Sequence, residues 1–269
     1  EVHIMGEGLA AKLNGPVGMD SFVGCQLKTI VAQAVQGKMV AVECNPKFDG
    51  AIPYVMRYQE TVFNFFNRLS STYNELFFYD GEKLIFGEPR KNPEALLKIG
   101  QDVFNFRTSA VAIPHEMAMY DYLGDEDKSI FMKAEQKPSS GLLADVERGA
   151  YNLFYGDEAE LYASTSPVIS DYYLKALADS KRSSTEGSML RVEGQTRTCQ
   201  ITIGGIAELS FSSGMNVPSM GKYRVVELVH KVDKTGNYSN YFVGTPAGKE
   251  HVTQQYCGAV KAYTEIAVA

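Results

Sequence analysis

The sequence has no tryptophan, few cysteines and no long apolar run. Its four cysteines are Cys25, Cys44, Cys199 and Cys257, and no two of them have the C-x-x-C spacing of zinc or redox motifs. Four thiols in 269 residues are too sparse for a disulfide scaffold, so we expect buried or idle thiols. The longest apolar stretches are far too short to span a membrane, and no basic-then-apolar signal sequence opens the chain.

An excess of positive charge is also missing. The 26 basic and 32 acidic residues give a net charge of −6, which argues against a surface built to bind nucleic acid. Hydrophobic residues make up 45% and charged residues 22%, so the chain can bury a core. The 16 tyrosines and 14 phenylalanines favour strands. A length of 269 residues suggests about two domains.

Motifs for catalysis and ligand binding are absent too. Residues 6–11 read G-E-G-L-A-A, but Asn14, Gly15 and Pro16 would break the helix that a dinucleotide site requires. The chain has no P-loop and no G-x-S-x-G motif. The acidic run at residues 125–127 lacks the spaced ligands of a calcium loop, so we expect it to be solvated. We therefore predict no catalytic residue, no cofactor-binding residue and no metal ligand.

The four histidines stand alone in the sequence. They are His3, His115, His230 and His251, and no two are spaced to place both rings on one helical face. His230 lies in a strand pattern, so we interpret it as a half-exposed cross-strand partner.

The first third of the chain predicts two helices and a hairpin. Residues 26–36 carry an apolar stripe at helical spacing and end at Gly37. Residues 61–73 carry a second stripe, which Thr61 can cap. Asp80-Gly81 lies between two aromatic and aliphatic runs, which predicts a hairpin over residues 76–86 with a type I′ turn. Short strands are expected at residues 2–5, 39–44 and 52–58.

From residue 94 the pattern becomes rich in strands. We expect strands at residues 95–99, 103–108, 111–122, 189–194, 200–203, 207–211, 223–232 and 238–243. The loop at residues 233–237 makes the last two a hairpin, and residues 124–128 and 137–141 are further loops.

One helix is predicted near residues 167–186, with Ser166 as the cap and Pro167 in the first turn. Its expected buried face consists of Ile169, Tyr172, Tyr173, Ala176 and Leu177. The fold class is therefore α+β, with more strand than helix.

Residues 57–87 carry a motif that closely resembles the middle of the VgrG (valine-glycine repeat protein G) spike proteins of type VI secretion systems. That family has a QYxETDxxFLxRLxxxxGxxFxYD segment that leads into an aromatic hairpin. The matching residues here are Tyr58, Gln59, Glu60, Thr61, Phe63, Phe66, Arg68, Leu69, Phe77, Tyr79, Asp80 and Gly81. Asn74 stands where the family usually has Gly, and Asn tolerates the positive φ expected there.

Two further stretches support the resemblance. The residues Ser21, Phe22, Leu27, Ile30 and Val31 match the family's S-F-x-x-x-x-L-x-x-I-V helix entry. Residues 223–246, with a G-N-Y-x-N-x-F-x-G-x-P pattern, resemble the hairpin that ends the family's hub module.

The resemblance implies a module similar to the hub of a contractile phage baseplate, with small β-barrel domains and inserted helices. In such hubs three chains surround an axis, and two barrels per chain give a ring of pseudo-sixfold character. We expect an α+β unit at residues 1–93 with an incomplete first barrel, a barrel-like unit at residues 94–250, and a linker at residues 251–269. Strands before Glu1 and an OB-fold and needle after Ala269 are expected to lie outside this chain.

The resemblance also implies a function, that of a structural hub at the base of a membrane-puncturing spike. We expect a homotrimer at the end of the tube of a type VI secretion-like apparatus, with tube and baseplate proteins as partners and effectors as further ones. The chain would be neither an enzyme nor a nucleic-acid binder, and would reach a target membrane only through the needle. It would assemble in the bacterial cytoplasm and leave the cell on contraction. Type VI secretion, an extracellular injection particle and a phage tail remain open.

Two other functions remain as alternatives. A carboxylate-based hydrolase would need a deep pocket with two carboxylates about 5 to 10 Å apart. A β-rich ligand- or carbohydrate-binding module would need exposed aromatic platforms, whereas the helix and hairpin periodicity places most rings on buried faces.

Overall fold

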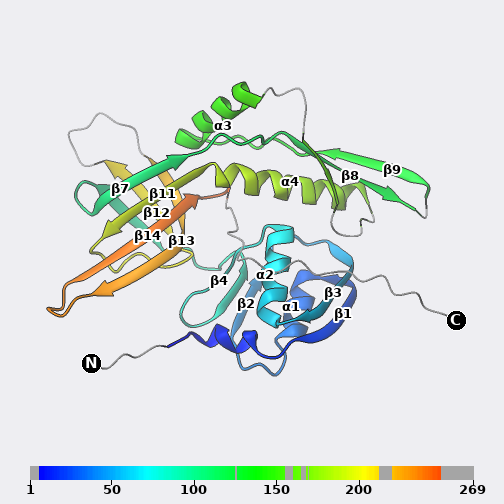
Figure 1. Ribbon diagram of the computed structural model, residues 1–269, viewed down its shortest axis with the longest axis horizontal. Helices are drawn as coiled ribbons and strands as arrows, with labels where there is room; N and C mark the ends of the chain where they lie inside the picture. The colour runs from blue at the N-terminus through cyan, green and yellow to red at the C-terminus, as the bar shows by residue number, and fades with distance from the viewer. Residues whose placement is uncertain are drawn as a thin grey trace.

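The computed structural model describes residues 6–124, 126–154, 160–164, 168, 170–211 and 220–249. These residues form a strand-rich α+β fold with three parts (Figure 1). An N-terminal unit lies below the long helix α4 (Asp171–Ser188), a closed barrel lies at one end of this helix, and a strand arm lies along the other. The expected strand at residues 2–5 falls outside the described residues.

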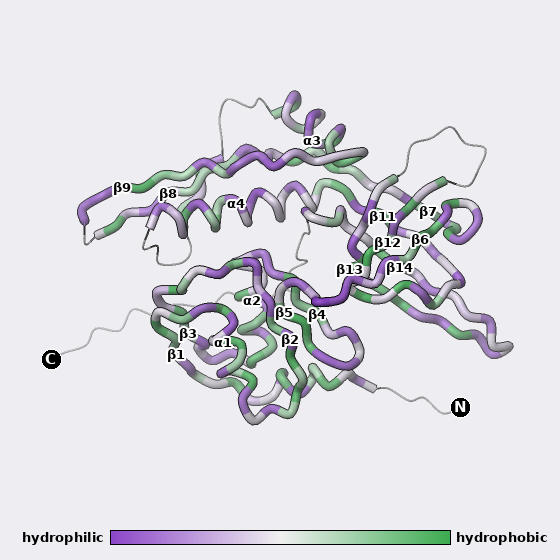
Figure 2. The backbone as a smooth tube through the Cα atoms, turned by 180° about the vertical axis from the view of Figure 1, so that it is seen from behind, coloured by the Kyte–Doolittle hydropathy of each residue, from purple (hydrophilic) through white to green (hydrophobic). Residues whose placement is uncertain are grey.

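The N-terminal unit combines two small sheets with two helices. In chain order its elements are η1 (Leu9–Asn14), β1 (Gly18–Gln26), α1 (Leu27–Ala34), β2 (Val42–Asn45), β3 (Ala51–Glu60), α2 (Val62–Tyr73), β4 (Phe77–Tyr79) and β5 (Leu84–Gly87). Strands β1 and β3 pair antiparallel, and the second sheet has the order β2-β5-β4. Phe65, Phe66 and Phe86 are fully buried between them, and the hydropathy colouring of Figure 2 shows green segments converging there.

Both predicted helices of this unit are confirmed. Helix α2 begins after Thr61, whose hydroxyl accepts a hydrogen bond from the Asn64 amide at 3.1 Å. It ends at Asn74, which has the left-handed conformation expected of it, with φ 51° and ψ 48°. Glu60 and Arg68, both matched to the family motif, form an ion pair that ties the end of β3 to α2.

The predicted hairpin is confirmed, but its predicted turn is wrong. Phe77 pairs with Phe86 and Tyr79 with Leu84. A type I′ turn needs positive φ at both central residues, and of the Asp80-Gly81 pair only Gly81 has it, at 105°. Asp80 instead folds the loop with its side chain, because its Oδ1 accepts hydrogen bonds from the amides of Glu82 at 2.9 Å and Lys83 at 2.8 Å.

Six strands close into a barrel in the order β11-β14-β13-β12-β6-β7. They are β6 (Glu94–Ile99), β7 (Val103–Ala110), β11 (Leu190–Thr196), β12 (Ile206–Phe211), β13 (Gly221–Val232) and β14 (Tyr238–Pro246). Closure leaves this sheet without open edges, and Val192, Leu209 and Phe242 fill the interior. The predicted β13–β14 hairpin is confirmed, whereas the strand expected at residues 200–203 is absent.

A long excursion between β7 and β11 builds the arm. It contains β8 (Met117–Leu123), β9 (Lys128–Lys133), α3 (Gly141–Phe154), β10 (Glu160–Ala163) and α4, with a sheet in the order β10-β8-β9. The predicted strand at 111–122 starts only at Met117, because Pro114 has no amide to donate to a ladder. The sequence did not indicate α3, because Glu147 interrupts its short apolar face.

The last predicted helix exists but starts later than expected. It is capped by Ser170, whose hydroxyl accepts from the Tyr173 amide at 3.2 Å, and Ser166, Pro167 and Ile169 lie outside the described residues. Tyr173 and Leu177 are buried as predicted. Tyr172 is 66% exposed, so its assignment to the buried face was wrong.

The hydrophobic core does not follow the predicted division of the chain at residue 93. The core of the N-terminal unit also takes in Tyr173, Leu174 and Leu177 of α4. The barrel has a core of its own. The division into units at residues 1–93 and 94–250 therefore remains a prediction, and α4 packs on the N-terminal unit as well as on β8 and β9.

Gly87 and Gly81 offer a matched test of the hairpin. Both have positive φ, but a Cβ on Gly87 would lie 2.2 Å from the Asn45 carbonyl oxygen, whereas a Cβ on Gly81 meets nothing within 4 Å. We expect Gly81→Ala to lower the free energy of unfolding by about 1 kcal/mol and Gly87→Ala by several times more, because β5 would have to separate from β2. Urea unfolding of both variants measures the difference, and equal losses would contradict the crowding at Gly87.

Candidate interaction surfaces

Helix α4 is held to the arm and the barrel exit by a buried network of ion pairs. Arg182 is 1% exposed, and its guanidinium donates to Glu186 at 2.7 Å and to Glu116, just before β8, at 2.8 Å. Lys249, which follows β14, forms an ion pair with Glu186 and donates to the Lys137 carbonyl at 3.0 Å. The network thus joins α4, the arm, the 134–140 connection and the end of the barrel.

The charges of this network compensate one another. Burial acts to raise the pKa of the Glu116 carboxyl, but hydrogen bonds and charges from Arg182 and Lys133 bring it below its usual value. Glu186 is buried between Arg182 and Lys249, so both of its oxygens have cationic partners. Removing one member would leave another charge buried without its partner.

The same helix is also attached to the N-terminal unit. The hydroxyl groups of Tyr73 and Tyr173 lie 2.7 Å apart, and Ser180 Oγ donates to the Tyr73 carbonyl at 2.8 Å. Phe48 packs against both tyrosine rings, with centroids 4.6 and 5.3 Å away. Buried Glu75 fixes the Phe48 loop by accepting from the Phe48 amide at 2.7 Å, and burial raises the pKa of its carboxyl.

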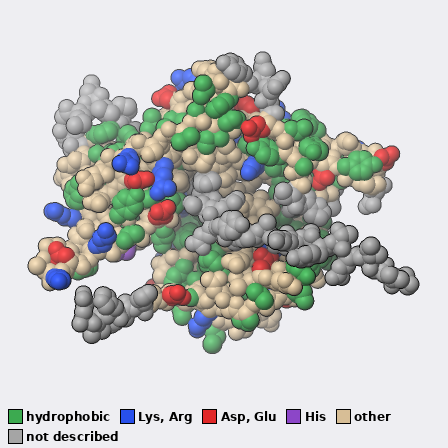
Figure 3. All heavy atoms as spheres, in the orientation of Figure 1, with side chains coloured by type: hydrophobic (Ala, Val, Ile, Leu, Met, Phe, Trp, Pro, Cys, Tyr) green, Lys and Arg blue, Asp and Glu red, His purple; other side chains and the backbone are tan. Residues whose placement is uncertain are grey.

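The outer face of the arm sheet is apolar and exposed. Tyr120, Tyr122, Phe131 and Leu161 are 45 to 59% exposed, and Tyr120 is paired with Phe131 across β8 and β9. On the opposite face, Met119 and Met132 pair and pack towards the core that includes α4. Figure 3 shows hydrophobic atoms gathered over the arm and over α3. A contiguous apolar face of this kind is typical of a protein–protein contact.

The exposed rings of the arm differ from the prediction that most aromatic rings lie on buried faces. Phe65, Phe66 and Phe86 are buried as the helix and hairpin patterns indicate. The arm rings are not, because an antiparallel strand with one face on a helix leaves its other face in solvent. Residues 117–123 read M-A-M-Y-D-Y-L and have no polar–apolar alternation, so the surface becomes evident only from the pairing of β8 with β9.

The β13–β14 hairpin forms a second projecting surface, at the opposite end of the long axis from the β8–β9 turn (Figure 1). Val229 and Val232 are exposed on it. The Asp233 carboxylate closes the loop by accepting from the side chain and amide of Thr235 and from Asn237, and these hydrogen bonds lower its pKa strongly. His230 is exposed and contacts Tyr238 at 2.6 Å between Nδ1 and the hydroxyl, as expected of a cross-strand partner.

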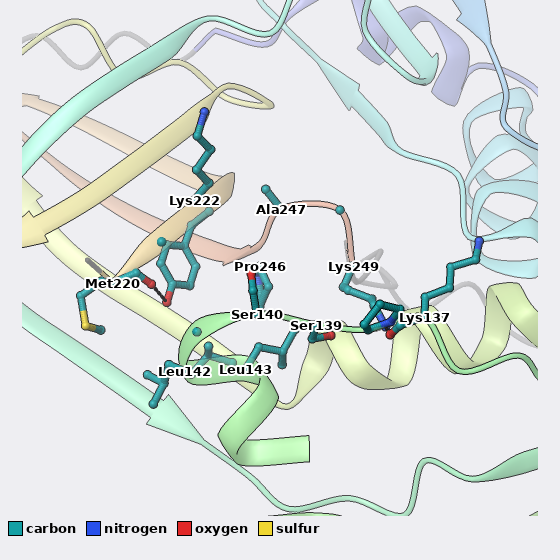
Figure 4. A pocket seen from close by; sticks show the side chains of 16 residues that line it. Lys137, Ser139, Ser140, Leu142, Leu143, Met220, Lys222, Pro246, Ala247 and Lys249 are labelled. Carbon is teal, nitrogen blue, oxygen red and sulfur yellow. Dashed lines mark hydrogen bonds between the residues drawn. The ribbon is translucent and has the colours of Figure 1, made fainter. Parts of the chain in front are cut away.

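A cavity between the barrel and the start of α3 has no catalytic arrangement. It has a volume of about 520 Å³, and Figure 4 shows Lys137, Lys222 and Lys249 around it. No carboxylate lines it, Lys249 is held by Glu186, and Lys222 Nζ lies 3.1 Å from Glu94. Three further cavities formed by described residues contain one carboxylate each: Glu43, Asp20 or Asp233. The paired carboxylates that a hydrolase requires are therefore not found among them.

The remaining predictions concern metal ligands, cysteines, histidines and membrane-spanning segments. Within the described residues no group of three or more His, Cys, Asp or Glu side chains could hold a metal ion. Cys25, Cys44 and Cys199 are free thiols, and burial raises the pKa of Cys44 to about 11. Cys257, His3 and His251 lie outside the described residues. In the part of the chain that the structure describes, no helix is long and apolar enough to cross a membrane.

Comparison with known proteins identifies the fold of this chain but assigns it to no family. No protein-family model and no curated protein matches the sequence. The fold is similar to the 43 kDa tail protein of prophage MuSo2 from Shewanella oneidensis, with a TM-score of 0.61 and 12% identity over 88% of this chain and 71% of that one. It is also similar to a tail protein from Neisseria meningitidis, with a TM-score of 0.63 and 8% identity over 89% and 72% of the two chains.

The chain shares a phage tail and baseplate hub-like fold. An Escherichia coli protein is also similar, with a TM-score of 0.54 and 12% identity over 92% of this chain and 56% of that one. It is described as a component of the type VI secretion system with structural similarity to the T4 bacteriophage tail proteins gp27 and gp5. The predicted fold class is thus confirmed, and membership of the VgrG family remains a prediction.

The network around α4 makes a quantitative prediction. Replacing Arg182 with Met should lower the free energy of unfolding by about 3 to 5 kcal/mol, because Glu186 and Glu116 lose a buried partner. Lys175→Met is the matched control on the same helix, since its partners Glu135 and Asp179 are 3.3 Å away in a more exposed setting, and it should cost less than about 1 kcal/mol. Denaturant unfolding compares the two, and similar losses would show that the network does not stabilise the fold.

Proposed function

We propose that this chain is a structural hub at the base of the spike of a contractile injection apparatus. The observation that carries the proposal is the architecture itself, a closed barrel and an α+β unit joined by α4, which tail proteins share over 88 to 89% of this chain. The motif of residues 57–87 favours a type VI secretion-like apparatus over the other contractile systems. The family resemblance also favours a homotrimer at the end of the tube.

The surfaces support a scaffold rather than an enzyme. The described cavities hold no paired carboxylates, whereas the arm presents an exposed apolar face. Such a face suits contact with other subunits, including tube and baseplate proteins and effectors. In this proposal the chain assembles in the bacterial cytoplasm, leaves the cell on contraction, and reaches a target membrane only through a needle.

The oligomeric state is the first test of this function. Light scattering after size exclusion should give three times the chain mass at high micromolar concentration, because a hub surrounds the tube axis. The whole natural protein is the sample, so that every subunit contact it makes is retained. A strict monomer under these conditions would contradict the hub assignment.

Export provides an independent test. A tagged chain should appear in the culture medium of its host and disappear when the sheath gene is deleted, because contraction drives delivery. Equal export with and without the sheath would contradict a role in a contractile apparatus.

A further inference from the structure

The two projecting ends of the molecule carry opposite charge. The β8–β9 turn exposes Glu126 and Asp127, with Asp121 beside them, against a single lysine, Lys128. The β13–β14 end exposes Lys231 and Lys234, with Arg197 at its base. Its one carboxylate, Asp233, is occupied by hydrogen bonds within the loop. On a chain with a net charge of −6, a basic end is the exception.

The charges at both ends are available to a partner. Lys231 and Lys234 are exposed and form no ion pair among the described residues, and Glu126 forms none either. Arg197 is held in place by the Phe104 ring, with its guanidinium carbon 5.3 Å from the ring centroid. Figure 3 shows blue atoms together with red ones at the end of the hairpin, and red atoms at the end of the arm.

Apolar side chains accompany the charges at each end. Tyr122 and Phe131 are more than half exposed on the arm, and Val229 and Val232 are exposed on the hairpin. Together with Tyr120 and Leu161, the arm presents about 400 Å² of apolar side-chain surface, roughly half of the ~800 Å² that each partner buries in a standard interface. The charged side chains around this apolar face can supply the rest of the buried area.

We propose that the arm of one copy binds the β13–β14 hairpin of the next copy, head to tail. The arm contributes Glu126, Asp127 and the Tyr122–Phe131 face, and the hairpin contributes Lys231, Lys234 and Val229, which lies on the same face of β13 as Lys231. A contact between two unlike surfaces of one chain repeats around an axis, and it closes into a ring when the rotation between neighbouring copies is an exact fraction of a full turn; otherwise it gives an open filament. This inference rests on the proposed hub function, which supplies the closed trimer.

Charge reversal tests the contact. The arm variant carries Glu126→Lys and Asp127→Asn, since Asn tolerates the positive φ of 49° at that position. The hairpin variant carries Lys231→Glu and Lys234→Glu. Each should raise the concentration needed for half-assembly at least about tenfold at low salt, because like charges then face each other. The combined variant should assemble within about threefold of the wild type, because the attraction is restored with the signs exchanged.

Two controls separate this contact from a general charge effect. Glu82→Lys reverses an exposed charge in the β4–β5 turn, and Lys91→Glu reverses one before the barrel, and neither should change assembly. Raising salt from about 50 to about 500 mM should weaken the wild-type trimer and reduce the difference between variants. Thermal unfolding confirms that each variant is folded.

The outcomes distinguish this inference from the function on which it rests. A wild-type chain that stays monomeric contradicts both. A wild-type trimer that persists unchanged in the arm and hairpin variants overturns the head-to-tail contact alone and leaves the hub function standing. Loss of assembly in both variants without rescue in the combined variant also overturns the direct pairing of these two ends.

Discussion

The structure depends on the buried ion pair between Arg182 and Glu186, one turn apart on α4. Buried ion pairs are poor sources of stability, because desolvation offsets most of the attraction, but they tolerate few alternative arrangements. Here Arg182 also binds Glu116, and Glu186 also binds Lys249, so the pair fixes α4 against the start of the arm and the exit of the barrel. A shift of α4 by one turn would leave these charges buried and unpaired.

With α4 fixed, the positions of the projecting ends follow. The arm sheet packs one face on α4, so the direction of β8 and β9 is that of the helix. The barrel is closed, and its β13–β14 hairpin extends from it at the other end of the long axis. Tyr173 and Ser180 then attach the N-terminal unit to the middle of the same helix. A scaffold needs such fixed distances between its surfaces more than it needs a pocket.

Local sequence patterns predicted the helices of the N-terminal unit and most barrel strands. They failed where contacts between residues far apart in the sequence determine the structure. Thr61 and Asn74 bound α2 through their own backbone and side-chain preferences, so sequence was sufficient there. Helix α3 went unrecognised because Glu147 occupies its buried face, where only Ser139, brought in by the fold, satisfies it. Tyr172 was assigned to the buried face because the helical period places it there, yet it is exposed beside Asp49. The arm surface needed the strand pairing of Tyr120 with Phe131, which no short stretch of sequence specifies.

The partners of the acidic side chains agree with the absence of catalytic motifs from the sequence. Glu75 and Glu186, which are buried, and Glu116, which is half-buried, each accept hydrogen bonds from amides or cations of the fold. Lys231, Lys234 and Glu126, which form no ion pair within the described part of the chain, are exposed at the two ends. An exposed charge stays hydrated, so it destabilises the fold little, and it interacts with other charges over about one Debye length. Such groups are suited to steering and specifying subunit contacts, which is the role proposed for the two projecting ends.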